Sequence, residues 1–190
     1  SMPYDADRFE VSNHKWTALA EEGRGCAVLN DCKYGVNVVG NTIMLTLLKS
    51  PMAPDMTADK GRQEFTYAFY AWNGPLATSP LVREGYGLNV APLVVPGVAA
   101  APRSLFSVDA ENVVIETVKP AEDATRDVVV RLYESKRTAT RCSLATTLPL
   151  AGAEETDMLE NPLGALPVSD GAVALDLRPF GVKTIRLRLA

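Results

Sequence analysis

An all-β fold made of antiparallel β-sandwich elements is the fold class that this sequence predicts. Its apolar residues recur mostly at every second position, which is the period of a half-buried strand and not of a helix. A two-residue loop, Gly40 and Asn41, separates two apolar runs as in a β-hairpin. In the second half of the chain, about six short apolar runs alternate with turn residues, which is typical of a small sandwich.

Four apolar runs predict the strands of the first half. They are residues 25–29, 36–39, 42–48 and 63–72. The glycine-first loop between the second and third runs predicts a type II′ turn. In the fourth run, Phe65, Tyr67 and Phe69 share one face, and Tyr70 lies on the opposite face. We expect the face of Phe65, Tyr67 and Phe69 to be buried, because aromatic side chains at strand spacing usually belong to a core.

The middle of the chain predicts a helix followed by a connector. Residues 79–86 are weakly helical, with Thr78 or Ser79 as the cap and Pro80 in the first turn. Residues 89–103 contain prolines and a run of small residues, and they show neither period. Because proline fixes φ and removes a ladder donor, this segment is expected to be extended. We therefore predict two domains, residues 1–100 and residues 101–190.

The second half predicts a small antiparallel sandwich of its own. Its expected strands are residues 105–108, 113–118, 127–134, 141–148, 172–177 and 182–189. In the last strand, three apolar residues alternate with three polar ones; these are Ile185, Leu187 and Leu189 against Thr184, Arg186 and Arg188. The alternation predicts one buried face and one polar face.

Charge and composition exclude several classes of protein. The formal net charge is −4 and the basic residues are scattered, whereas nucleic-acid binders carry a basic face or stripe. No apolar run approaches the roughly 20 residues that cross a bilayer, so no membrane partner is expected. His14 is the single histidine, so a histidine-built metal site or a charge relay would depend on this one ring.

The three cysteines, Cys26, Cys32 and Cys142, predict free thiols. Their odd number and the absence of an opening signal peptide fit a reducing compartment, so we expect a cytoplasmic protein. The spacing of Cys26 and Cys32 is not that of a zinc site, and mostly buried, inert thiols are expected. The opening pair Ser1 and Met2 has the form of a tag-cleavage scar, which predicts that the chain begins within a longer protein.

Paired carboxylates are the first candidates for chemistry, because glycosidases work with two such groups. The pairs are Glu21 with Glu22, Glu122 with Asp123, and Glu154 and Glu155 with Asp157. All lie in polar, turn-like segments, whereas a catalytic acid needs an apolar pocket or a close like charge to raise its pKa. We expect solvated loop acids, with Thr156 or Asp157 capping a turn at residues 158–160.

Residues 30–35 form the densest polar group between two predicted strands. Asn30 and Asp31 suit a turn, Lys33 adds a cation, and Tyr34 adds an aromatic face. Aromatic rings stack on sugars and polar side chains bond their hydroxyls, so these four residues are candidates for substrate binding. The same composition also describes an ordinary connection between strands, and both interpretations stay open from the residues alone.

Seven segments resemble, in their order and spacing, the region that follows the catalytic domain in family 38 glycoside hydrolases, the α-mannosidases. They are residues 27–35 (AVLNDCKYG), 45–51 (LTLLKSP), 64–68 (EFTYA), 113–119 (VVIETVK), 130–134 (VRLYE), 155–160 (ETDMLE) and 179–185 (PFGVKTI). The similarity extends from about Arg8 to Leu189. Gly181 and Val182 stand where the family often has Glu-Ile, a departure that touches packing and not chemistry.

The resemblance implies the C-terminal β region of a retaining α-mannosidase. It implies the end of a large mutarotase-like supersandwich, followed by a small immunoglobulin-like sandwich. In this family, zinc and the catalytic acids belong to an N-terminal catalytic domain, so these roles carry over to no residue of this chain. The resemblance also places the loop of residues 30–35 near the sugar site. Many relatives have Asp-Arg where this chain has Asp31 and Cys32, so Lys33 is left to supply a point charge.

We expect this chain to be a scaffold for that catalytic domain and to form part of the border of the sugar site. On its own the chain is expected to be inactive and to hold no cofactor. The alternative is an independent carbohydrate-binding module that uses Trp16, Tyr34 and Tyr70 as its exposed aromatics. A self-sufficient mutarotase-like enzyme is a third interpretation, which the single histidine disfavours. We also expect a free sheet edge and an apolar patch in the first half, through which the chain dimerises or aggregates.

Overall fold

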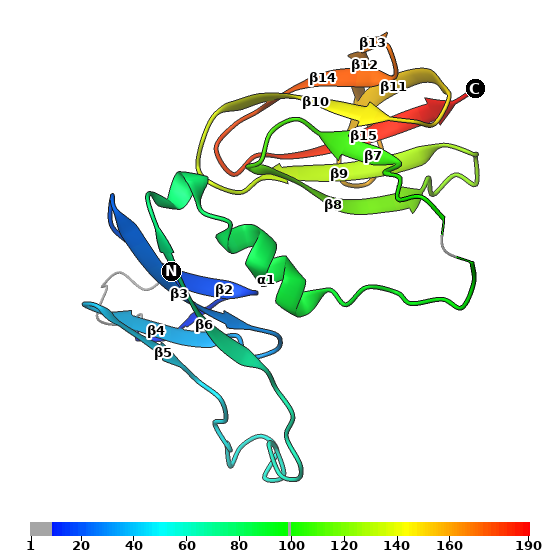
Figure 1. Cartoon of the computed structure of the whole chain (residues 1–190). Coiled ribbons are helices and arrows are strands. Elements are labelled where there is room, and N and C mark those ends of the chain that lie inside the picture. Colours follow the sequence, from blue (N-terminus) through cyan, green and yellow to red (C-terminus); the bar gives the residue numbers. More distant parts are fainter. Residues whose placement is uncertain (1–8, 99) are drawn as a thin grey trace. The chain divides into compact units, whose positions relative to one another are not determined.

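The computed structural model describes residues 9–98 and 100–190 and confirms the predicted all-β fold class (Figure 1). Ser1 and Met2, on which the prediction of a tag scar rests, lie outside the described residues. The chain divides into two compact units, residues 1–96 and residues 97–190. Among the helices of the described segments, none is long and apolar enough to cross a membrane.

Two three-stranded antiparallel sheets make up the strands of the first unit. The strands are β1 (Val11–Ser12), β2 (Trp16–Ala20), β3 (Arg24–Asn30), β4 (Gly35–Val39), β5 (Thr42–Leu45) and β6 (Tyr67–Asn73). One sheet has the order β2-β3-β6 and the other has the order β1-β4-β5. Strand β6 begins at Tyr67, four residues later than the alternating run suggested, because the strand pairing with β3 covers residues 67–73 only.

The hairpin of β4 and β5 has the predicted two-residue loop. Val39 pairs with Thr42, and Gly40 and Asn41 form the turn between them. Gly40 has a φ of 57°, and Asn41 does not have a positive φ. A positive φ at the first loop residue alone is the pattern of a type II′ turn, which glycine adopts without steric cost.

The helix of the first unit differs from its prediction at both ends. A short 3-10 helix, Leu76–Thr78, precedes the α-helix α1 (Leu81–Asn89). Pro80 occupies the N-cap position, and the cap is without a side-chain hydrogen bond, so neither Thr78 nor Ser79 caps α1 as expected. The helix extends three residues beyond the predicted end, and the Nδ2 group of Asn89 donates to the Gly85 carbonyl at 2.8 Å in its last turn.

The buried face of β6 is the opposite of the predicted one. Tyr67 is 56% exposed and Phe69 is 73% exposed, whereas Trp72 is only 8% exposed. Trp72 and Tyr70 join the core of the first unit, which also contains Leu81 of α1. Gly85 lets α1 approach the sheet closely, because an added Cβ there would lie 2.8 Å from Cδ1 of Trp16 in β2.

The second unit is a β-sandwich of nine strands. They are β7 (Phe106–Val108), β8 (Val113–Pro120), β9 (Val128–Glu134), β10 (Thr140–Thr146), β11 (Leu150–Thr156), β12 (Pro162–Leu166), β13 (Val168–Ser169), β14 (Ala172–Leu177) and β15 (Val182–Leu189). One sheet has the order β13-β14-β10-β7 and the other has the order β12-β11-β15-β9-β8. Strands β11, β12 and β13 were not predicted: glycine and two glutamates interrupt the alternation of β11, proline and glycine interrupt that of β12, and β13 has only two residues.

The two sheets of the second unit enclose one apolar core. It combines Leu144 and Leu175 of the first sheet with Leu132, Ile185 and Leu187 of the second. The last strand, β15, lies in the middle of the five-stranded sheet and pairs with β11 on one side and β9 on the other. The predicted burial of Ile185 and Leu187 in β15 is confirmed, and Thr184 of the predicted polar face is also buried, at 2% exposure.

The acids predicted to be solvated in the second half are mostly paired in the structure. Glu154 lies in β11, is only 8% exposed, and accepts from Arg188 Nη2 at 2.7 Å. Arg186 of β15 pairs with Asp123 at 2.7 Å and with Asp127 at 2.8 Å. The expectation of solvated loop acids is therefore wrong for Glu154, because β11 places it beside the arginines of β15.

The turn after β11 is organised by Asp157, as predicted. Its Oδ1 atom accepts from the amide of Leu159 at 2.8 Å and from the amide of Asn161 at 2.9 Å. The Asn161 side chain also donates to Oδ2 of Asp157, at 2.8 Å. This bond and the two amide bonds hold the pKa of Asp157 below its usual value, with the Asn161 side chain contributing most. The carboxylate therefore closes the turn in the manner of a helix cap.

Glu134 at the end of β9 is a fully buried carboxylate that sequence analysis did not single out. Its Oε1 atom accepts from Asn112 Nδ2 at 2.9 Å and from the Lys136 amide at 2.7 Å. Its Oε2 atom accepts from the Phe180 amide at 2.9 Å. Burial alone would raise the pKa of Glu134, but these donors outweigh it and lower the pKa below its usual value.

The predicted connector is free of helix and strand wherever the structure describes it after Asn89. Its apolar side chains are open to solvent, with Leu93 at 90% and Val98 at 99% exposure. The thiols are less uniform than expected: Cys142 is buried, Cys26 is half-buried and Cys32 is exposed. The prediction of mostly buried thiols therefore holds for Cys142 and is wrong for Cys32, which lies in the loop after β3.

Candidate functional site

The loop between β3 and β4 is shaped by two asparagines. Asn30, the last residue of β3, is fully buried, and its Nδ2 group donates to Asn13 Oδ1 at 2.8 Å. Its Oδ1 atom accepts from the Lys33 amide at 3.0 Å, which closes the turn. Asn13 in turn donates from Nδ2 to the Tyr34 carbonyl at 3.0 Å. The two amides therefore fix the backbone that carries Lys33 and Tyr34.

Asp31 ties the same loop to the segment before β6. Its Oδ2 atom accepts from the Thr66 amide at 2.9 Å, and its own amide donates to the Thr66 carbonyl. The Cys32 thiol and the Thr66 amide together hold the pKa of Asp31 below its usual value. The same contact with the Asp31 carboxylate raises the pKa of the Cys32 thiol, so this exposed cysteine is not an activated nucleophile.

Lys33 and Tyr34 present their side chains beside aromatic rings. The Nζ atom of Lys33 lies 4.7 Å from the centre of the Phe65 ring. Tyr34 is 49% exposed, and its ring centre lies 4.8 Å from that of His14. Phe65 also stacks with Tyr67, with ring centres 6.4 Å apart. We call His14, Lys33, Tyr34, Phe65 and Tyr67 the loop cluster.

The structure thus separates the four predicted contact residues into two roles. Tyr34 is 49% exposed and Lys33 is partly exposed, whereas Asn30 is fully buried and Asp31 is bound to Thr66. Asn30 was predicted to touch substrate, and in the structure its side chain is fully buried and held by Asn13. Sequence reasoning placed His14 on its own and Phe65 and Tyr67 in a core, so it did not join these rings to the loop. The missing information was which face of β6 the helix α1 covers.

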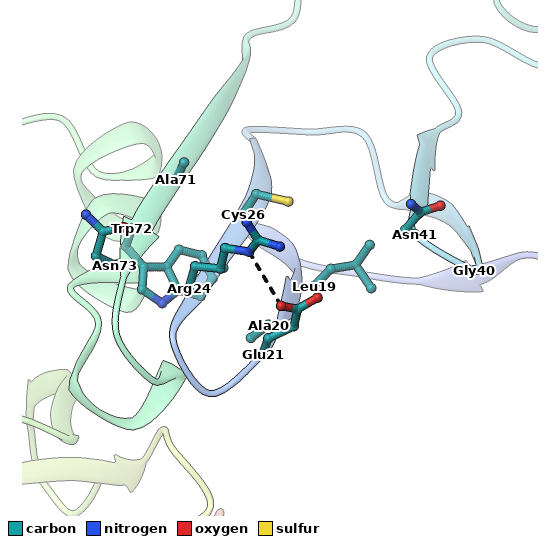
Figure 2. Close-up of a pocket in the computed structure, with 11 residues that line it drawn as sticks. Leu19, Ala20, Glu21, Arg24, Cys26, Gly40, Asn41, Ala71, Trp72 and Asn73 are labelled. Carbon is teal, nitrogen blue, oxygen red and sulfur yellow. Dashed lines mark ion pairs between the residues drawn. The ribbon is translucent and has the colours of Figure 1, made fainter.

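A cavity of about 500 Å³ lies elsewhere in the first unit (Figure 2). Residues from the β2–β3 turn, the end of β6 and the hairpin loop of Gly40 and Asn41 line it. Figure 2 shows the ion pair of Glu21 and Arg24 at this cavity, at 3.4 Å, with both side chains largely exposed. An exposed pair of this kind contributes at most about 1 kcal/mol. The lining contains a single carboxylate, so it forms no acid pair.

The displaced pKa values of the carboxyl groups all move in one direction. Wherever the structure displaces the pKa of a carboxyl group in residues 9–98 and 100–190, it lowers it. A general acid for glycosyl transfer needs a raised pKa. In the same residues, no three His, Cys, Asp or Glu side chains are grouped so that they could hold a metal ion. His14 is packed against Tyr34, so the donor set here does not fit a zinc site.

Comparisons with known proteins agree with one another along the chain. The model of the glycosyl hydrolases family 38 C-terminal domain matches residues 2–57. The model of the glycosyl hydrolases family 38 C-terminal beta sandwich domain matches residues 112–185. These two matches fall in different compact units, one in each.

Whole-chain relatives are α-mannosidases. Alpha-mannosidase 2C1 of Homo sapiens is 42% identical over 193 residues, which cover 98% of this chain and 19% of that protein. Alpha-mannosidase G of Dictyostelium discoideum is 35% identical, over 96% of this chain and 18% of that protein. An alpha-mannosidase structure from Enterococcus faecalis V583 shares the fold, with a TM-score of 0.70 at 20% identity over 93% of this chain and 21% of that one. The chain therefore spans about a fifth of the length of the relatives it matches.

Proposed function

Because this chain belongs to glycosyl hydrolase family 38 and corresponds to its C-terminal β-domains, we propose that it is the non-catalytic part of a retaining α-mannosidase that hydrolyses terminal α-mannosides. Its two units would scaffold an N-terminal catalytic domain of the same protein. The supporting observation is that the models of the family's C-terminal domain and C-terminal beta sandwich domain match residues 2–57 and 112–185, in a chain that spans about a fifth of its α-mannosidase relatives.

The second part of the proposal is that the loop cluster forms part of the border of the sugar site of that enzyme. Tyr34 offers a half-exposed ring that can stack on a sugar face, and the Lys33 ammonium can donate to hydroxyl groups. Asn30 and Asp31 act indirectly, because their side chains are used to hold the loop. Zinc belongs to the catalytic domain in this proposal, and a cytoplasmic location stays a prediction from the free thiols.

A carbohydrate-binding module is the second candidate, now with different residues. Trp16 and Tyr70 cannot belong to an exposed aromatic row, because both pack against the core of the first unit. Tyr67 and Phe69 instead share an exposed face of β6. Two exposed rings on one strand face are an arrangement that can stack on a sugar, which keeps this candidate open.

The two candidates predict different behaviour of the chain on its own. We expect no turnover of an activated α-mannoside, with or without added zinc, and no saturable heat of mannose binding by titration calorimetry. Saturable binding that Tyr67→Ala removes would favour the module. Zinc-dependent turnover above the blank would contradict the non-catalytic assignment.

In the full-length enzyme that carries this region, Lys33→Met is expected to raise KM for an α-mannoside about tenfold. The reason is that a charge-assisted hydrogen bond contributes about 1.5–3 kcal/mol, and its loss mainly weakens binding. Steady-state kinetics would measure KM and kcat separately, with Lys60→Met in the exposed loop after β5 as the matched control. An unchanged KM in Lys33→Met would remove the loop from the sugar site and leave the scaffold role intact.

A further inference from the structure

The backbone of Asn30, where β3 passes into the candidate loop, is bonded to two separate segments of the first unit. Its amide donates to the Lys15 carbonyl at 3.0 Å. Its carbonyl accepts from Nδ2 of Asn89, the last residue of α1, also at 3.0 Å. Asn30 is fully buried, so its backbone groups depend on partners within the protein. Asn89 supplies one of these partners and thereby joins the end of α1 to the start of the loop.

The side chain of Asn89 is itself held in place. Its Nδ2 group also donates to the Gly85 carbonyl, one helical turn earlier, at 2.8 Å. The two hydrogens of one amide nitrogen therefore serve the helix and the loop. The Val90 amide closes the same turn of the helix by donating to the Tyr86 carbonyl at 2.8 Å. A donor fixed in this way makes the position of the Asn30 backbone depend on the position of α1.

The end of α1 also holds the segment that carries His14. Lys15 has a φ of 68°, and the Trp16 amide donates to the His14 carbonyl at 2.8 Å, which is the pattern of a γ-turn. A positive φ is uncommon in a lysine and persists where surrounding contacts hold it. Two contacts do so here: the Lys15 carbonyl accepts from Asn30, and the Lys15 Nζ atom lies 4.8 Å from the centre of the Tyr86 ring.

We propose that Asn89 is a positioning residue for the loop cluster, which places Lys33 and Tyr34 by holding the Asn30 backbone. The side chain of Asn30 passes this placement on, because its Oδ1 atom accepts from the Lys33 amide and its Nδ2 group donates to Asn13. Asn13 then bonds the Tyr34 carbonyl. The effect on sugar binding rests on the proposed function, whereas the placement of the loop by Asn89 does not.

His14 provides a readout of loop placement in the chain alone. It is the single histidine, and its ring centre lies 4.8 Å from that of Tyr34. The ring current of Tyr34 therefore displaces the NMR signals of the His14 ring protons, and Tyr34→Leu measures the size of this displacement. Asn89→Ala is expected to move the His14 signals toward their position in Tyr34→Leu. Arg83→Ala, at an exposed position of the same helix, is the matched control and should leave them in place.

Two further variants separate the amide donor of Asn89 from the shape of its side chain. Asn89→Asp has nearly the same shape but no hydrogen to donate, so it should move the His14 signals as Asn89→Ala does. Asn89→Gln keeps an amide donor and should retain more of the original signal position. Circular dichroism and thermal melting show which variants are folded, and Asn89→Asp decides the outcome where Asn89→Ala fails to fold.

In the full-length enzyme that carries this region, Asn89→Ala is expected to raise KM for an α-mannoside about two- to tenfold without changing kcat. This range corresponds to the net contribution of one hydrogen bond, and a contact that only aids binding affects KM alone. A purely structural role would instead reduce the amount of folded enzyme and leave KM unchanged. Added to Lys33→Met, Asn89→Ala should raise KM little further, because both changes act on the same contact.

The NMR and kinetic results together distinguish this inference from the proposed function. Unmoved His14 signals in every folded Asn89 variant would overturn the positioning role. An unchanged KM in Asn89→Ala, where Lys33→Met raises it, would overturn that role as well. Moved His14 signals with an unchanged KM in both variants would support the placement of the loop by Asn89 and contradict its location at the sugar site.

Discussion

Glu134→Ala is expected to lower the free energy of unfolding of the second unit by about 3–5 kcal/mol. The carboxylate is fully buried, and its removal leaves the amides of Lys136 and Phe180 and the side chain of Asn112 without their acceptor. Each buried donor left unpaired costs about 1–3 kcal/mol, and a typical domain is stable by only about 5–15 kcal/mol. Urea denaturation would measure the loss, with Glu116→Ala on an exposed position of β8 as the control.

The same carboxylate gives this loss a definite pH dependence. The pKa of Glu134 in the folded unit lies below 4.5, the usual glutamate value. A group whose pKa is lower when folded contributes stability above its unfolded pKa, and this contribution disappears as the pH falls through the folded pKa. The stability difference between the unaltered chain and Glu134→Ala should therefore be full at neutral pH and shrink below about pH 4.5. A difference that does not change with pH would show that the carboxylate is not ionised in the fold.

Asn30→Ala is expected to lower the free energy of unfolding of the first unit by about 2–4 kcal/mol. The change leaves the Lys33 amide without its acceptor and Asn13 Oδ1 without its donor, both in a loop closed around a fully buried side chain. Chemical denaturation followed by tryptophan fluorescence reports on this unit, because Trp16 and Trp72 belong to its core. Asn41→Ala in the exposed hairpin loop is the matched control and should change stability by less than about 0.5 kcal/mol.

The Asn30 variant also tests whether Asn30 acts by positioning the loop or by touching the sugar. If the asparagine holds the loop and touches no sugar, the full-length enzyme carrying Asn30→Ala should lose affinity for substrate because Lys33 and Tyr34 are displaced. Asn30→Asp keeps the acceptor for the Lys33 amide and should retain more of that affinity than Asn30→Ala. Equal loss in both variants would contradict a purely positioning role for the Oδ1 atom.

The sequence predicted most strands because their apolar residues alternate. It failed where packing or ion pairing with distant segments decides which residues form a strand or which face is buried. For β6, alternation predicted two faces but could not say which one is buried, since that depends on α1, whose Leu81 shares a core with Trp72. Strand β11 was missed because Glu154 and Glu155 resemble loop residues until β15 supplies their cations. Pairing between distant segments is not encoded in local periodicity.

The candidate site remains a prediction, and the structure shows how its residues are held and which rings lie beside them. The composition of residues 30–35 identified Lys33 and Tyr34, and the structure shows both accessible. It could not show that Asn30 is turned inward, because an asparagine suits a turn equally well as a ligand-binding or as a structural amide. Nor could it join Phe65 to the loop, because that contact depends on the bond between Asp31 and Thr66 across the sheet.

The central position of β15 has a consequence for synthesis on the ribosome. Residues 182–189 supply the strand that joins β11 to β9, so these two halves of the five-stranded sheet cannot meet until that segment has emerged. Until then the nascent chain holds the β8–β9 hairpin and the β11–β12 hairpin as separate pieces with open edges. Within this unit, completion of the five-stranded sheet therefore follows synthesis of its other strands, and their open edges are exposed to wrong partners in the interval before it.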